Sequence, residues 1–239
     1  MRKRIAATVL LSACAVCFCS GQSFGFGIPQ GLDAVKSSVP GANLVPSSVY
    51  YSRSDIDYLY RTVADADALL NESMEILAGM LFNKDEVQKY KLKMKEIEAI
   101  KNTKEKDAAL KNIHVEMQAA VEKQLTLQET ASVVKQLNAQ QRLLFCDAVY
   151  NVGLAGLLDT DAVLQAKNIV QYIQGSPTAS ISYAADIKKI GAVTTNLPTQ
   201  SVKVVTLANN LVKLAKTGKI EVKIPQAKTE KAKPVNSGW

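Results

Sequence analysis

The sequence has few of the residues that bind metals or form disulfides. Its 239 residues include one histidine, one tryptophan and four cysteines. Cys14, Cys17 and Cys19 have no fourth ligand nearby, because the next cysteine is Cys146. A zinc site needs four ligands of the Cys, His or carboxylate type, so a metal site at this cluster is disfavoured. If the N-terminal cysteines are removed, Cys146 stands alone and no internal disulfide can form.

Motifs of catalysis are also missing. His114 has no glutamate three residues before it, so the Glu-x-x-His pattern of di-metal carboxylate bundles is absent. No Gly-x-Ser-x-Gly nucleophile motif occurs. We favour the interpretation of His114 as an ordinary helix-surface histidine. The alternative is that it is a general base or a metal ligand. We therefore predict no enzymatic activity, no catalytic, cofactor-binding or metal-binding residues, and no cofactor.

Positive charge is present in only mild excess. The chain has 29 Lys and Arg against 22 Asp and Glu, a net charge of +7. Arg2, Lys3 and Arg4 supply three of those positive charges, so the rest of the chain carries about +4. Aromatic residues are not interleaved with lysine or arginine, which argues against a nucleic-acid partner. Weak contact with anionic lipid or cell-wall polymer remains compatible with this charge.

The first 23 residues have the pattern of an export signal. Arg2, Lys3 and Arg4 precede an uncharged apolar run from Ile5 to Phe18, and small residues follow. A run of this length is too short for a transmembrane helix, which needs about 20 apolar residues. The pattern predicts a protein exported from a bacterial cell to the periplasm or beyond.

Two kinds of signal cleavage fit these residues. The segment LSAC, Leu11 to Cys14, resembles the lipobox of bacterial lipoproteins. That resemblance implies cleavage before Cys14, lipid on its sulfur, and a membrane anchor. Ordinary cleavage near Ser23 or Gly25 would instead discard all three cysteines. We favour ordinary cleavage, because the apolar stretch continues past Cys14.

The remainder predicts an all-α protein of three parts. Residues 24–53 are rich in Pro, Gly and Ser and predict a flexible strap. Residues 54–217 predict an elongated helical bundle, built on a long antiparallel hairpin with shorter C-terminal helices. No Pro or Gly occurs between Lys84 and Arg142. Residues 218–239 are rich in lysine and predict a disordered basic tail, which opens with a short strand-like alternation at 219–224.

Apolar periodicity and capping residues set the expected helix ends. Ser54, with Asp57 three residues on, predicts the start of the first helix. Residues 85–125 fit either one rod or two helices, because 101–107 interrupts the apolar stripe. The segment GLAGLLDTD predicts a bend, with Asp159 or Thr160 capping the next helix. That helix should stop at Gly175, and two shorter helices should follow, separated at 194–198 and ended by Gly218.

Two stretches are candidates for contact with a membrane or partner. Residues 149–158 are the most apolar segment after the signal, and Leu154, Leu157 and Leu158 would form an inserting tip. This layout resembles that of helical pore-forming toxins in architecture only; the alternative, which we favour, is a packing point of small residues. Tyr50, Tyr51 and Tyr58 crowd the start of the first helix. They would pin the strap to the bundle or form a docking patch.

The sequence thus predicts an exported, non-catalytic helical structural or interaction protein of a bacterial cell envelope. Its partner would be another envelope protein or a second copy bound through helix faces, with weak lipid or polymer contact through the basic tail. The alternative is a membrane-active protein that inserts residues 149–158.

Overall fold

The computed structural model describes residues 50–235, which form seven helices and no strand. The predicted export signal, Cys14 and residues 24–49 of the predicted strap lie outside these described residues. The all-α prediction is confirmed. The helices are α2 (Arg53–Leu81), α3 (Lys84–Glu98), α4 (Thr103–Gln124), α5 (Gln128–Gln136), α6 (Ala139–Gly175), α7 (Pro177–Ser182) and α8 (Ala184–Thr217).

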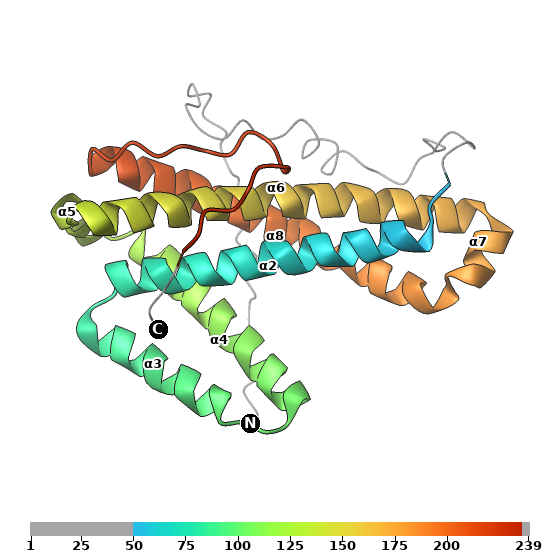
Figure 1. The fold of residues 1–239 in the computed structure, drawn as a ribbon, viewed down its shortest axis with the longest axis horizontal. Coiled ribbons are helices and arrows are strands. Elements are labelled where there is room, and N and C mark those ends of the chain that lie inside the picture. The colour runs from blue at the N-terminus through green and yellow to red at the C-terminus, as the bar shows by residue number, and fades with distance from the viewer. Residues whose placement is uncertain (1–49, 236–239) are drawn as a thin grey trace, which may run out of the picture.

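Three long helices make an elongated bundle (Figure 1). Helices α2 and α8 run in one direction and α6 runs in the other, packed against both. The short α7 joins α6 to α8 at one end, and α3 and α4 form a hairpin that projects from the side of α2. With 37 residues, α6 is about 55 Å long.

Helix α2 begins two residues earlier than predicted. Ser52 is its N-cap, and the carboxylate of Asp55 accepts from the main-chain N–H of Ser52 at 2.7 Å. Ser54 and Asp57 have the same spacing but lie inside the helix. Ile56, Ala66, Leu70, Leu77 and Leu81 recur at helical spacing along α2 and are all buried.

Residues 85–125 form two helices rather than one rod. Asn83 caps α3, accepting from the main-chain N–H of Glu86 at 2.9 Å. Asn102 caps α4, accepting from Lys104 N–H at 3.0 Å. The break at residues 99–102 allows α4 to fold back, so that Tyr90 on α3 and Met117 on α4 are both buried.

The predicted bend after residue 152 is wrong. Helix α6 runs without interruption through the whole of GLAGLLDTD, and Asp159 and Thr160 are buried within it rather than capping a new helix. Packing explains the difference. A Cβ added at Gly156 would lie 3.2 Å from Val205 Cγ2, so this glycine gives α8 room to approach α6. The predicted stop at Gly175, with Pro177 beyond it, is confirmed.

The prediction of two short helices before Gly218 is also wrong. Helix α8 is one element of 34 residues with Pro198 inside it. An internal proline removes one helical hydrogen bond and costs about 3 kcal/mol. Ile190 before the proline and Val204 after it are both fully buried, so packing on each side of Pro198 favours a continuous helix. Gly218 ends the helix as predicted.

The C-terminal tail is not disordered between residues 219 and 235. It runs along α6 without strand pairing and reverses direction at a turn of residues 227–230 (Figure 1). The prediction of disorder counted the lysines of this segment and gave too little weight to the apolar residues between them. Ile220 is buried, and Val222, Ile224 and Val235 pack against the core.

The apolar core has two parts along the length of the bundle. The larger surrounds the contacts of α2, α4, α6 and α8, and includes Met74, Met117, Phe145 and Leu211. The smaller lies toward the α7 end. Polar side chains lie between the two parts on the same helices. The smaller part consists of Ile56, Leu59, Ala162, Val163, Ala166, Ile169, Ile173, Ala179, Ile190 and Leu197.

Candidate interaction surface

Tyrosines from different segments gather at the α7 end of the bundle. The rings of Tyr50 and Tyr51 lie 5.7 Å and 5.6 Å, centre to centre, from the ring of Tyr172 on α6. The hydroxyl of Tyr183, between α7 and α8, donates to the main-chain oxygen of Tyr51 at 3.2 Å. Two of the tyrosines singled out from the sequence therefore contact tyrosines more than 100 residues away in the chain.

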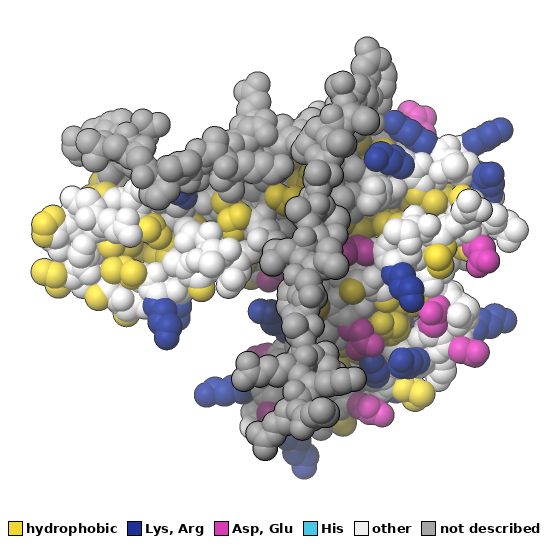
Figure 2. Space-filling view, turned by 180° about the vertical axis from the view of Figure 1, so that it is seen from behind, with side chains coloured by type: hydrophobic (Ala, Val, Ile, Leu, Met, Phe, Trp, Pro, Cys, Tyr) yellow, Lys and Arg dark blue, Asp and Glu magenta, His cyan; other side chains and the backbone are white. Residues whose placement is uncertain are grey.

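Large apolar side chains are exposed at the same end. Ile181 is 82% exposed and Tyr50 is 74% exposed, with Tyr58 and Ile187 more than 40% exposed. Figure 2 shows apolar side chains along the arm that ends at α7, where charged side chains are sparse. We call this region the α7-end surface. It consists of Tyr50, Tyr58, Tyr172, Ile181, Tyr183 and Ile187.

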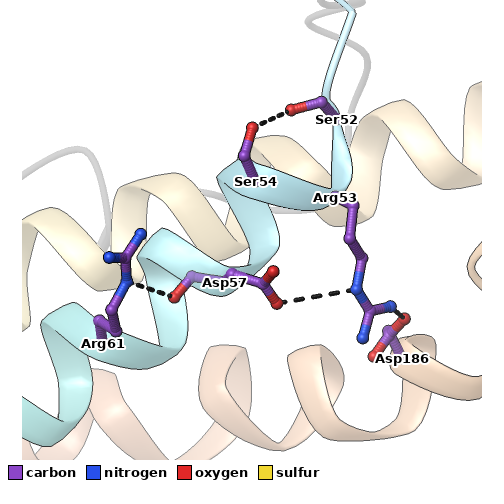
Figure 3. Close-up of polar contacts among 6 residues, drawn as sticks. All are labelled: Ser52, Arg53, Ser54, Asp57, Arg61 and Asp186. Atoms are coloured by element: carbon purple, nitrogen blue, oxygen red, sulfur yellow. Dashed lines mark hydrogen bonds and ion pairs between the residues drawn. The ribbon is translucent and has the colours of Figure 1, made fainter.

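A polar contact holds the first turn of α2 to the first turn of α8 beneath this surface (Figure 3). The guanidinium of Arg53 donates to the carboxylate of Asp186, whose side chain is 7% exposed. Arg53 also lies 3.6 Å from the carboxylate of Asp57. This contact joins residues 133 positions apart. It holds the start of α2, which carries Tyr58, to the start of α8, which carries Ile187.

The charge around the α7-end surface is of both signs. Asp186 is paired with Arg53, and Asp57 is exposed next to Tyr58. Lys188 and Lys189 are exposed next to Ile187. A partner of this end therefore meets apolar rings and side chains bordered by charges of both signs.

The predicted inserting leucines lie elsewhere. Leu154 is 2% exposed, and Leu157 and Leu158 are half-buried, all in the middle of α6 rather than at the tip of a hairpin. Because α6 is unbroken, it is the one described helix long and apolar enough to cross a membrane by length and composition. However, 67% of its apolar stretch is buried inside the bundle, as expected of a core helix.

His114 lies between α4 and α2. Its Nε2 is 3.5 Å from Glu75 Oε1, and both side chains are less than 20% exposed. Sequence spacing could not reveal this neighbour, because Glu75 is 39 positions earlier on another helix. No group of three or more potential metal-binding side chains (His, Cys, Asp or Glu) occurs within residues 50–235.

Asp159 is a buried acid in the polar layer between the two parts of the core. The residue is 1% exposed, and its Oδ1 has no hydrogen-bond partner. Burial, and to a lesser extent the nearby carboxylate of Asp67, raises the pKa of Asp159 to about 7. Next to it, Thr160 donates to the main-chain oxygen of Gly156 at 2.8 Å, and its hydroxyl lies 3.1 Å from that of Ser201.

Cys146 is a half-buried thiol beneath the C-terminal tail. Its Sγ lies 3.5 Å from the main-chain oxygen of Glu221. Burial and the neighbouring carboxylate of Asp147 raise the pKa of this thiol above its ordinary value. Since the thiolate is the reactive form, the surroundings of Cys146 favour an inert side chain.

No protein family, curated protein or solved structure matches this chain.

Proposed function

We propose that this chain is an exported, non-catalytic interaction protein of a bacterial cell envelope, and that it binds another envelope protein through the α7-end surface. The export signal pattern of residues 1–23 supports the location. The exposed apolar side chains around the tyrosine cluster support the mode of binding. Tyrosine is enriched in protein interfaces, because its ring buries a large apolar area and its hydroxyl forms hydrogen bonds.

The observation that carries this proposal is the exposure of Ile181 beside a set of ordered tyrosines. An isolated exposed isoleucine needs no explanation, but one next to other exposed apolar side chains is typical of a binding site. The Arg53–Asp186 contact and the ring contacts of Tyr172 fix the surface before any partner binds. A rigid surface loses less conformational entropy on binding, which favours affinity.

An affinity experiment with matched variants tests this proposal. Tagged wild-type chain and an Ile181→Asp variant would be used to recover partners from an envelope extract. Leu143→Asp is the control, because Leu143 is also an exposed apolar residue, at 63%, on the opposite end of α6. We expect one protein to be recovered with wild type and with Leu143→Asp, and to be lost with Ile181→Asp. Equal recovery with both variants would contradict the assignment of the surface.

A second candidate function is direct action on a membrane. It is favoured by the length and apolar character of α6 and by the exposed lysines at 188 and 189, which anionic lipid would attract. Lys223 and Lys231 of the tail are exposed as well and would add weak attraction to lipid or polymer. Release of dye from anionic liposomes tests this candidate, and Leu157→Asp is expected to reduce the release. No release by the wild-type chain would eliminate it.

A further inference from the structure

The C-terminal tail is held to α6 by contacts with its main chain. Asn151, which is fully buried on α6, donates from Nδ2 to the main-chain oxygen of Lys233 at 2.9 Å. The Oδ1 of the same side chain accepts from the main-chain N–H of Lys233 at 2.8 Å. An amide that pairs with both main-chain groups of one residue holds an extended segment in register, whatever side chain that residue carries.

Side chains of the tail add contacts that select for charge. Tyr150 donates to the carboxylate of Glu230 at 2.6 Å, a bond that raises the pKa of Tyr150 to about 12. Lys228 Nζ lies 2.5 Å from the carboxylate of Asp161. Lys233 Nζ lies 5.0 Å from the centre of the Tyr150 ring. The ligand of this face is therefore a peptide that turns at residues 227–230, with one lysine in the turn and a second lysine five residues later.

We propose that this face of α6, defined by Cys146, Tyr150, Asn151 and Asp161 and called the α6 clasp, is a peptide-binding site that can take the C-terminal tail of a second copy of this chain in exchange for its own. Residues 219–235 of the chain's own tail contact this site. A second copy has the same tail and can therefore make the same contacts. Exchange of an identical segment between copies is a low-cost route to a dimer.

The connection to the tail suits such an exchange. Lys219 has a φ of 56°, in the left-handed region that residues other than glycine adopt rarely. This is where the chain leaves α8 and turns onto its own α6. In an exchanged dimer the clasp contacts are the same, while this turn is free to open. The site is distinct from the α7-end surface, so the proposal does not rest on the proposed function.

In the ordinary chain the tail competes for its own clasp. A tethered segment has an effective concentration of the order of millimolar, so at micromolar concentrations the wild-type chain should remain a closed monomer. Exchange can be detected when one chain has an altered clasp and an intact tail, and another has an intact clasp and an altered tail. In neither chain can the tail then bind the clasp of the same chain.

Mixing two full-length variants tests the proposal. The clasp variant is Asn151→Ala, which keeps an intact tail. The tail variant combines Lys228→Ala with Lys233→Pro, which removes the N–H that Asn151 accepts and keeps an intact clasp. By sedimentation velocity at about 50 µM, below the effective concentration of the tethered tail, we expect each variant alone to be a monomer and the mixture to contain a one-to-one heterodimer.

Two controls keep the result decisive. Replacing the tail variant by Lys231→Ala, which changes an exposed lysine of the same segment, should abolish the heterodimer, because that chain closes on its own clasp. A second clasp variant, Tyr150→Phe with Asp161→Asn, replaces Asn151→Ala if the latter loses its helical circular dichroism. A mixture that contains only monomers, with a clasp variant that retains its helical content, overturns the proposal.

Discussion

Arg53 and Arg61 lie on the same helix but differ in what they contact (Figure 3). Arg53 pairs with Asp186, which is 5% exposed, whereas Arg61 only donates to the main-chain oxygen of Asp57 at 3.4 Å. Removing Arg53 leaves a buried carboxylate without its partner, and such a loss costs about 1–3 kcal/mol. We expect Arg53→Ala to lower the free energy of unfolding by about 1–2 kcal/mol, because the arginine itself is largely exposed.

Urea unfolding of the two alanine variants measures this difference. Arg61→Ala is the control and should change stability by less than about 0.5 kcal/mol, as surface substitutions usually do. Equal effects of the two substitutions would show that the contact with Asp186 contributes nothing specific.

Asp159 should make the stability of the fold depend on pH. An aspartate in the unfolded chain has a pKa of 3.8, while in the fold burial raises the pKa of Asp159 to about 7. Between these values the folded state holds a proton that the unfolded state has released. The free energy of unfolding should therefore fall as pH rises from 4 to 7, by at most about 1.4 kcal/mol per pH unit.

An Asp159→Asn variant isolates this contribution from that of other acids. Asparagine stays neutral at every pH, so the variant should gain stability relative to wild type as pH rises, and should be the more stable protein at pH 8. Unfolding by urea at a series of pH values gives the difference directly. A difference that does not change between pH 4 and pH 8 would mean that Asp159 is not buried as described.

Gly191, inside α8, and Gly218, at its C-terminal end, have opposite surroundings. A Cβ at Gly218 would lie 2.6 Å from Val134 Cγ1 on α5, whereas a Cβ at Gly191 would meet nothing within 4 Å. Overpacking of this kind typically costs about 1–3 kcal/mol. Alanine in an open helix interior gains about 0.5–1 kcal/mol over glycine.

Gly218→Ala should therefore lower the melting temperature and Gly191→Ala should raise it. The clash is with Val134 alone. The double variant Gly218→Ala with Val134→Ala should therefore lose less stability than the sum of the losses in the two single variants. Thermal unfolding followed by circular dichroism gives all four values. Strict additivity would indicate that α5 does not pack against the end of α8.

The docked tail should protect Cys146 from chemical labelling. In a chain with Cys14, Cys17 and Cys19 replaced by serine, Cys146 is the only thiol. The main chain at Glu221 covers its sulfur, so labelling by a water-soluble maleimide should be slow. Detaching the tail with Lys228→Ala and Lys233→Pro should raise the rate at least severalfold, and an unchanged rate would contradict the docking of the tail.

Helix ends show how far sequence patterns reach. Ser52 with Asp55 and Ser54 with Asp57 match the same capping pattern, so the sequence alone could not choose between them. The break near 101–107 was visible as a loss of apolar period, and Asn102 does cap the helix that follows. Asp159 and Thr160, which look like caps, lie inside α6, because their surroundings depend on contacts with other helices rather than on neighbours in sequence.

The fold class could be predicted from the sequence, but the candidate site only in part. Apolar periodicity and the lack of proline and glycine between residues 84 and 142 indicated a helical protein. Tyr50, Tyr51 and Tyr58 stood out by their crowding, but Ile181 and Tyr172 carried no local signal. Only the return of the chain through α7 brings these residues to the same end. The tail was misjudged because its apolar residues and its contact with Asn151 are hidden by its lysines.

We propose that the α7-end surface meets a partner in the cell envelope. Photo-cross-linking in living cells can detect that contact, with a photoreactive amino acid placed at position 181 or, as the control, at position 143. We expect one discrete cross-linked product from position 181 and none from position 143. No product from position 181, or the same product from both positions, would contradict it.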